Sequence, residues 1–178
     1  MIEKIINRVS HKNLSDPVPS KEEMGKIYQA ALRAPDHALL KPTKFIEVSG
    51  KGLDKLSNIF KKYVLENGTE SEKRRIEKYA SAPYRAPMVI VLVTDIKFHP
   101  KVPEMEQFLS TAAAAQNILL AIDSLGYGGI WRTGILALND KLNLWLNRFN
   151  EEILLPPLLV SSLSLEVNRL SSFFQFNA

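Results

Sequence analysis

The sequence predicts one compact domain that combines helices with β-strands. Its 178 residues, 46% hydrophobic and 24% charged, match the size and composition of a single soluble domain. Apolar residues recur three and four positions apart in several segments, which is typical of helices with one buried face. Residues 88–93 are instead an unbroken apolar run, which indicates a strand buried on both faces. No repeat or linker divides the sequence, so we expect a single domain over residues 1–178.

The first half of the chain is expected to contain four helices and one strand. Their order is helix 2–9, helix 20–34, strand 44–48, helix 53–65 and helix 70–79. Helix 20–34 has the clearest signals, because Ser20 and Glu23 form a capping box at its start and Pro35 restricts the residue before it. Its predicted buried stripe consists of Met24, Ile27, Tyr28, Ala31 and Leu32.

The second half is expected to contain a long central helix over residues 104–125. Glu104 and Glu106 lie where a helix N-terminus favours negative charge, and residues 107–122 carry no charge at all. The glycine-rich segment that follows ends this helix and leads to a strand over 130–132. The remaining expected elements are a helix over 139–146, a strand over 158–165, and a phenylalanine-rich C-terminal tail, residues 165–178, that docks on the domain or on a partner subunit.

Missing residue types and motifs exclude several kinds of chemistry. The chain has no cysteine, and its three histidines are too far apart in sequence to suggest a metal pair, so we expect no metal site. It has no nucleophile elbow, no phosphate-binding P-loop and no dinucleotide fingerprint. The net charge is only +4 with acids and bases interleaved, so we expect no nucleic-acid binding. No apolar stretch is long enough to span a membrane and no signal peptide opens the chain, so we expect a cytoplasmic protein.

Three segments could form parts of one site for an anion and an aromatic ring. In residues 8–12, two cations and a hydroxyl suited to a phosphate group follow the first helix, although a solvated basic turn would explain them equally well. In residues 33–37, an arginine ends a helix and a rigid Ala-Pro turn places the His37 imidazole four residues later, although a lone histidine is more often structural than functional. In residues 129–134, Trp131 and Thr133 would share one strand face and Arg132 the other, as in an ordinary edge strand.

Together with other short motifs, these segments resemble the FMN-dependent nitroreductase family, in particular its minimal members of about this length. The resemblance covers residues 2–145 and depends on motifs that occur in the family's order and spacing. They are I-N-R-x-S at residues 6–10, R-A-P-x-H/S at 33–37, a proline and an aromatic at Pro42 and Phe45, P-x-R-A-P at 83–87, and the long helix with its glycine turn at 115–134.

The resemblance implies an α+β fold with a mixed, mostly antiparallel sheet flanked by helices, and a homodimer with FMN at the subunit interface. A charge-free helix and a phenylalanine-rich tail are typical of such an interface. The implied FMN-binding residues are Arg8, Val9, Ser10 and Lys12 near the phosphate and the flavin N1–O2 edge, Arg33 and His37 in the turn, and Trp131, Arg132 and Thr133 on the other side. Ala121 and Gly126 match positions that help to receive the nicotinamide nucleotide in minimal members.

The implied activity is hydride transfer from NADH or NADPH through FMN to a small-molecule acceptor such as a nitroaromatic or a quinone. Two alternatives stay open: a flavin-binding store or sensor with little turnover, and a cofactor-free dimeric protein. The chain also departs from the family pattern, which affects the phosphate site, the flavin edge and the substrate side. These departures are Val9, which replaces a basic residue, Lys41 and Thr43 at the flavin edge, and Met105 and Phe108 at the start of the long helix.

Overall fold

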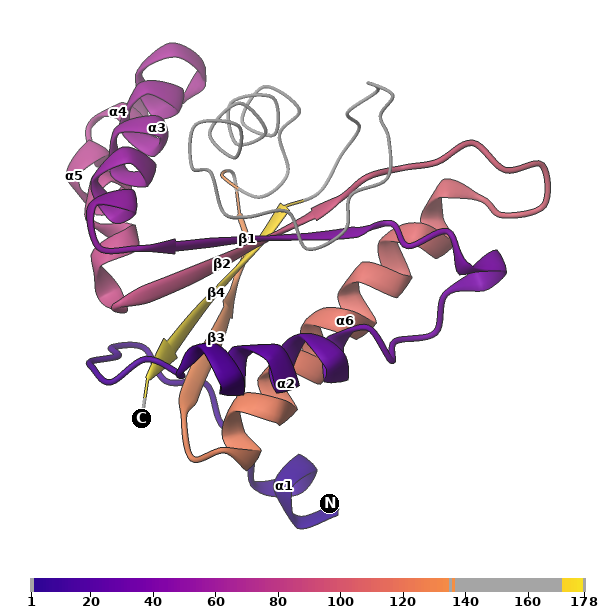
Figure 1. Ribbon diagram of the computed structural model, residues 1–178. Coiled ribbons are helices and arrows are strands. Elements are labelled where there is room, and N and C mark those ends of the chain that lie inside the picture. Colours follow the sequence, from indigo (N-terminus) through magenta and orange to yellow (C-terminus); the bar gives the residue numbers. More distant parts are fainter. Residues whose placement is uncertain (1, 135, 137–170, 178) are drawn as a thin grey trace.

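The computed structural model describes residues 2–134, 136 and 171–177, and it confirms an α+β fold with helices on both faces of a sheet (Figure 1). The strands are β1 (Thr43–Ser49), β2 (Met88–Thr94), β3 (Gly128–Arg132) and β4 (Ser171–Asn177), in the spatial order β1-β2-β4-β3. All three neighbouring pairs are antiparallel. β4 therefore lies between β2 and β3 although it is remote from both in sequence. The expected helix 139–146, the expected strand 158–165 and tail residues 165–170 lie outside the described residues.

β2 separates two hydrophobic cores, one on each face of the sheet. Val89, Val91 and Val93 pack toward α3 (Lys51–Asn67), whereas Met88, Ile90 and Leu92 pack toward α2 (Lys21–Ala31) and α6 (Glu104–Ser124). Every residue of β2 is buried. The prediction of a strand buried on both faces is confirmed, because successive side chains of a strand point to opposite faces and helices cover both.

α2 begins as predicted but ends earlier than expected. The Ser20 amide donates to Glu23 Oε2 at 2.7 Å and the Glu23 amide donates to Ser20 Oγ at 3.3 Å, which is the predicted capping box. Met24, Ile27 and Ala31 are buried. The prediction that Leu32 belongs to the buried stripe is wrong, because the helix ends at Ala31 and the Leu32 side chain is 62% exposed.

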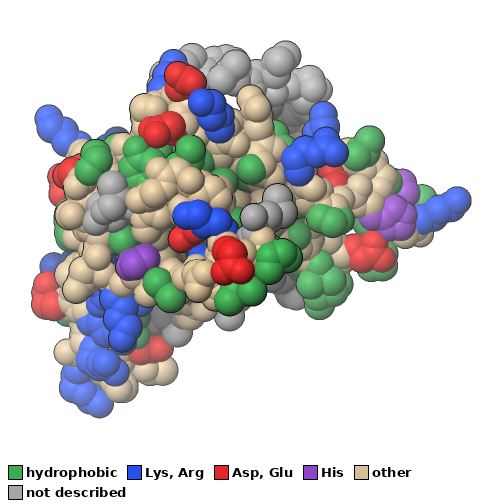
Figure 2. Space-filling model, turned by 90° about the horizontal axis from the view of Figure 1, so that it is seen from below, with side chains coloured by type: hydrophobic (Ala, Val, Ile, Leu, Met, Phe, Trp, Pro, Cys, Tyr) green, Lys and Arg blue, Asp and Glu red, His purple; other side chains and the backbone are tan. Residues whose placement is uncertain are grey.

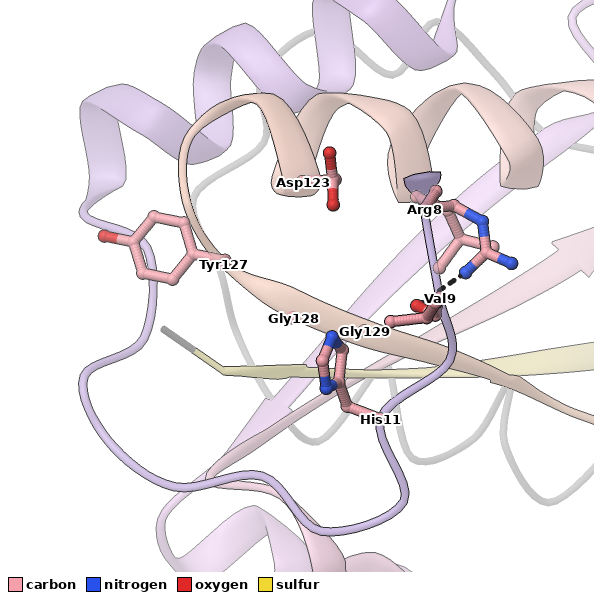
Figure 3. Close-up of a pocket in the computed structure, with 8 residues that line it drawn as sticks. Arg8, Val9, His11, Asp123, Tyr127, Gly128 and Gly129 are labelled. Atoms are coloured by element: carbon pink, nitrogen blue, oxygen red, sulfur yellow. Dashed lines mark hydrogen bonds between the residues drawn. The ribbon is translucent and has the colours of Figure 1, made fainter. Parts of the chain in front are cut away.

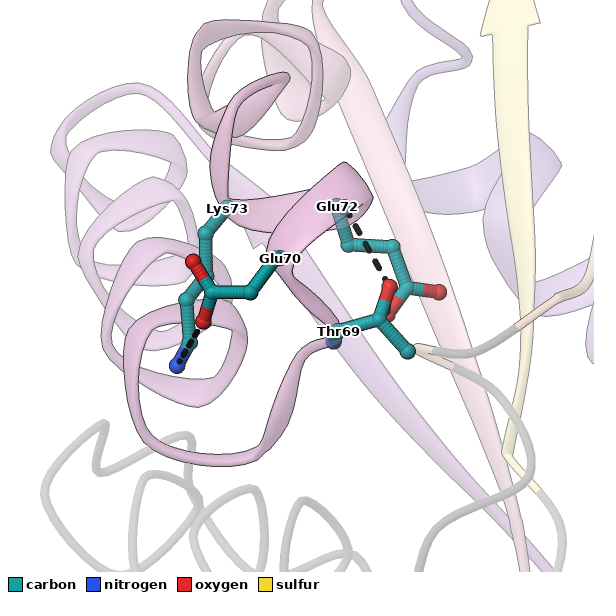
Figure 4. A network of polar contacts seen from close by, with 4 residues as sticks. All are labelled: Thr69, Glu70, Glu72 and Lys73. Atoms are coloured by element: carbon teal, nitrogen blue, oxygen red, sulfur yellow. Dashed lines mark hydrogen bonds and ion pairs between the residues drawn. The ribbon is translucent and has the colours of Figure 1, made fainter.

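The predicted helix 70–79 is two short helices, α4 (Glu70–Lys73) and α5 (Ile76–Ala80). Thr69 and Glu72 cap α4, and Lys73 pairs with Glu70 at 3.1 Å (Figure 4). The chain leaves helical geometry at Arg75, with φ −109° and ψ 25°. This break turns α5 so that it packs on α3, with Tyr79 partly buried against the α3 core.

α6 is the long helix expected from the sequence, and its two ends position the candidate site. Ala114, Ala115, Ile118, Leu119 and Ile122 are buried against α2 and the sheet. The short α1 (Ile2–Asn7) lies beside the C-terminal end of α6, and the 3₁₀ turn η1 (His37–Leu39) lies beside its N-terminal end (Figure 1). None of the helices within the described residues is long and apolar enough to cross a membrane.

Candidate functional site

The segment that follows α1 crosses β3 and reaches the 3₁₀ turn η2 (Ala82–Arg85). The His11 amide donates to the Gly129 carbonyl at 3.2 Å, and the Leu14 amide donates to the Arg85 carbonyl at 2.8 Å. Between them, Arg132 Nη2 lies 3.5 Å from the Lys12 carbonyl oxygen. The structure therefore brings the first predicted segment, residues 8–12, together with the third, residues 129–134.

The crossing is tight at Gly128, which has no side chain. A Cβ atom there would lie 3.0 Å from Cδ2 of the His11 ring, which is closer than about nine in ten Cβ contacts, so the ring would have to shift. The crevice that His11 shares with Arg8, Val9 and Gly129 has no space for even a water molecule (Figure 3). Arg8 Nη1 donates to the carbonyl of Val9 at 2.8 Å. This crevice is therefore a packing contact between the N-terminal segment and β3, not a ligand cavity.

A cavity of about 330 Å³ lies beside this crossing, at the C-terminal end of β3. Arg132 and Thr133 line it, whereas Trp131 packs on the opposite face of the sheet, against the α2–α6 core. The expectation that Thr133 shares a face with Trp131 is wrong, because β3 ends at Arg132 and Gly134 turns the chain at φ +108°. The other described lining residues are Leu56, Phe60, Lys78, Tyr79, Ala82, Pro83, Arg85, Val89, Gly134 and Leu136.

The cavity carries excess positive charge. Lys78, Arg85 and Arg132 line it, and none of its described lining residues is acidic. Nε of Arg132 is buried and has no hydrogen-bond partner in the described part of the chain. Burial lowers the pKa of Arg132, and the nearby charge of Arg85 lowers it further. A buried, partnerless guanidinium nitrogen beside a second cation favours an anionic ligand.

The second predicted segment, residues 33–37, forms a rigid turn at the other end of α6. His37 Nδ1 lies 2.7 Å from Oε2 of Glu106 in the first turn of α6. The carboxylate of Asp36 accepts hydrogen bonds from the Leu40 amide at 3.1 Å and the Lys41 amide at 2.7 Å. These bonds hold three non-glycine residues, Ala38, Leu39 and Lys41, at φ values of 62°, 54° and 51°. Such left-handed conformations persist only where the surroundings fix them, and they often occur at ligand sites.

The two halves of the predicted site do not meet within one protomer. Glu106, which holds His37, is near the start of α6, whereas Asp123, which pairs with Lys4 of α1 at 3.4 Å, is near its end. At 1.5 Å per residue, these two positions are about 25 Å apart along the helix axis. His37 therefore lies too far from residues 8–12, which contact the Asp123 end of α6, to bind the same small molecule in one chain. Arg33 lies nearer the middle of α6, because the Arg33 amide and the Asn117 side chain both donate to the carbonyl of Ala30.

The two predicted nicotinamide-binding residues lie at the C-terminal end of α6. Ala121 is partly buried against the α2–α6 core, and its carbonyl accepts the Leu125 amide at 3.1 Å. Gly126 follows the helix at φ +90°, a conformation that favours glycine at a helix C-terminus. Both residues have structural roles at this end of the helix.

Sequence reasoning missed several residues of the site. Asp36 and Glu106 hold the turn, and Arg85 lines the cavity, yet none was predicted to take part. The signal for Arg85 was available, since it is the arginine of the P-x-R-A-P motif. Thr43 is one of the residues at which the chain departs from the family pattern. Its Oγ1 lies 2.9 Å from Thr111 Oγ1, so this hydroxyl links β1 to α6.

Residues 5–156 match the model of the nitroreductase family. A protein of Escherichia coli (strain K12) with the provisional name NAD(P)H nitroreductase YdjA is 36% identical over 136 residues, 76% of this chain and 73% of that protein. A Haemophilus influenzae protein with the provisional name NAD(P)H nitroreductase is 38% identical over 133 residues, 73% of this chain and 70% of that protein. The chain therefore belongs to the nitroreductase family, as its motifs predicted, and is an oxidoreductase enzyme.

Solved structures show the same fold. A nitroreductase with bound FMN from Bacteroides fragilis NCTC 9343 aligns with a TM-score of 0.71 at 18% identity, over 99% of this chain and 86% of that one. The FMN-dependent nitroreductase NfnB from Mycobacterium smegmatis, in complex with NADPH, aligns with a TM-score of 0.68 at 16% identity and the same coverage.

Proposed function

We propose that this chain is an FMN-dependent NAD(P)H oxidoreductase whose FMN sites lie between the subunits of a homodimer. The observation that carries this proposal is the separation of the predicted site into two halves at opposite ends of α6. In a two-fold dimer, each surface of one subunit meets its counterpart on the other, so the 33–37 turn of one protomer can complete the 8–12 and 131–133 half of its partner. The names of the relatives support FMN as the cofactor and NAD(P)H as the reductant.

The exposed face of α6 supports the dimer. Met105 is 64% exposed and Leu109 is 60% exposed, and Ala112 and Ala113 continue the same stripe along the helix. Seen from below (Figure 2), exposed hydrophobic side chains lie near the middle of the surface beside acidic and basic side chains, and further Lys and Arg side chains gather at its lower left. An apolar stripe bordered by polar and charged side chains is typical of a protein interface.

The residues of the cationic half fit a phosphorylated flavin. Lys12 is exposed and forms no ion pair with any residue in 2–134, and the buried Nε of Arg132 has no hydrogen-bond partner among the described residues. When bound, FMN supplies the two-electron chemistry that joins a nicotinamide reductant to an acceptor. Lys12 and Arg132 would bind the negative charge of the cofactor, and Arg33 and His37 of the partner would close the site. No side chain is required as a nucleophile, and we propose a nitroaromatic, a quinone or a similar molecule as the acceptor.

One spectroscopic experiment tests this function. The purified full-length protein is expected to show a flavin spectrum, and its visible absorption is expected to bleach when NADH or NADPH is added without oxygen. Adding a nitroaromatic or a quinone should then restore the absorption. A yellow protein that neither nicotinamide bleaches would favour a flavin store or sensor, and a protein that stays colourless after incubation with FMN would overturn the proposal.

A further inference from the structure

Arg85 lines the same cavity as Arg132, although it lies outside the predicted FMN-binding residues. It is the last residue of η2, and its carbonyl accepts the Leu14 amide at 2.8 Å, so its backbone is tied to the segment that also contacts Arg132. Its side chain forms no hydrogen bond or ion pair with the described residues. A guanidinium that lines a cavity without a protein partner can bind a ligand.

The rest of the cavity complements this cationic side. Phe60 and Tyr79 add aromatic rings, and Leu56, Val89 and Leu136 add aliphatic surface, with no acidic residue among the described lining. Its volume of about 330 Å³ falls within the ~300–1,000 Å³ typical of small-molecule sites. Of the three cations that line the cavity, Arg85 and Arg132 repel each other until an anion lies between them, and Nε of Arg132 is buried with no hydrogen-bond partner among the described residues.

We propose that Arg85 and Arg132 together bind the oxyanion of a ligand whose apolar ring occupies the remainder of this cavity. The planar fork of a guanidinium matches the geometry of both phosphate and carboxylate, so the site takes either. The proposal rests on the proposed function, because the oxyanion is either the phosphate of FMN or an acidic group on the electron acceptor.

The experiment compares ligands that differ only in the anion. In the first arm, protein freed of flavin is titrated with FMN and with riboflavin, and binding is followed by quenching of flavin fluorescence. In the second arm, kcat/KM of the FMN-loaded enzyme is measured with meta-nitrobenzoate and with nitrobenzene. Each arm uses the wild type, Arg85→Gln and the control Arg74→Gln, which removes an exposed arginine that does not line the cavity. Circular dichroism and thermal unfolding verify that each variant is folded.

The wild type and Arg74→Gln are expected to prefer the anionic ligand in at least one arm, and Arg85→Gln to lose about 10-fold or more of that preference. Loss in the first arm identifies the FMN phosphate, and loss in the second identifies an acidic acceptor. Arg85→Lys is expected to retain an intermediate preference, which keeps the test valid if Arg85→Gln does not fold. An unchanged preference in both arms, or no preference in the wild type, overturns the proposal.

Failure of the proposed function has a different outcome. A wild-type chain that binds neither FMN nor riboflavin contradicts the proposed function but still allows the anion site to be tested. Benzoate and inorganic phosphate are then titrated by calorimetry. Binding that Arg85→Gln abolishes would support the anion site, and the absence of binding to the wild type would overturn it.

Discussion

Gly128 and Gly25 differ in the space around them, and this difference decides what a methyl group would do at each. A Cβ at Gly128 would press on the His11 ring at 3.0 Å, whereas a Cβ at Gly25, in the middle of α2, meets nothing within 4 Å. The His11 side chain would have to shift if residue 128 carried a side chain. This single position therefore affects how closely residues 8–12 pack on β3.

We expect Gly128→Ala and Gly25→Ala to change stability in opposite directions. Gly128→Ala should lower the free energy of unfolding by about 1–3 kcal/mol, the usual cost of overpacking, and should also weaken FMN binding because it displaces His11. Gly25→Ala should raise the free energy of unfolding by about 0.5–1 kcal/mol, since alanine restricts the unfolded chain and favours the helix. Urea unfolding of both variants checks this, and equal effects would contradict the close approach at Gly128.

At the scale of whole elements, two capping boxes make the stability of helix N-termini depend on pH. Hydrogen bonds from the backbone and side chain of Ser20 lower the pKa of Glu23 below its usual 4.5. Thr69 lowers the pKa of Glu72 in the same way (Figure 4). A carboxylate whose pKa is lower in the folded state binds fewer protons there than in the unfolded state. The stabilisation from both caps is therefore present above pH 4.5 and is lost as the pH falls through the folded-state values.

The stability of the double variant Glu23→Gln/Glu72→Gln should accordingly depend less on pH in the acidic range. The variant is expected to be less stable than the wild type at neutral pH and to lose less stability as the pH falls below 4.5. Melting temperatures measured across this range check the prediction. Parallel curves for the two proteins would show that neither cap responds to pH.

The elements that could be predicted from sequence are those with strong local signals. α2, β2 and α6 have a capping box, an unbroken apolar run and an uncharged stretch, respectively, and each begins where it was expected. The break between α4 and α5 was missed, because the two arginines at 74–75 carry no helix-breaking signal and the turn follows from packing on α3. The place of Arg85 in a cavity was missed for a different reason: its motif was recognised, but the cavity forms only when η2, α3, α5 and β3 come together.

At the scale of the whole molecule, the exposed face of α6 predicts how copies of the chain associate. Leu109 on α6 is 60% exposed, and Leu65 on α3, on the other side of the sheet, is 53% exposed. Because the two leucines are similarly exposed, Leu65 is a suitable control for a substitution at Leu109. Leu109→Arg should produce a monomer that retains little FMN, because a charge in the apolar centre of an interface is strongly unfavourable. Leu65→Arg should remain dimeric. Light scattering coupled to gel filtration distinguishes these outcomes, and a dimeric Leu109→Arg would place the interface elsewhere.

A shared site also predicts that two defective chains can restore each other. Arg132→Gln damages the cationic half of the site, and the double variant Arg33→Ala/His37→Ala damages the turn half, so each protein alone should bind FMN weakly. In a mixed dimer one site carries both lesions and the other carries none. Random mixing by co-expression should therefore recover about a quarter of the wild-type FMN content, measured as flavin absorbance per chain.

The matched control combines Arg132→Gln with Lys12→Ala, which damage the same half. Each site of that mixed dimer still carries one lesion, so no FMN binding should return. Different affinity tags on the two chains verify that mixed dimers form. If mixed dimers form and the first combination recovers no more FMN than the control, then Arg33 and His37 do not complete the site of the partner. The turn that Asp36 and Glu106 hold would then act within its own subunit.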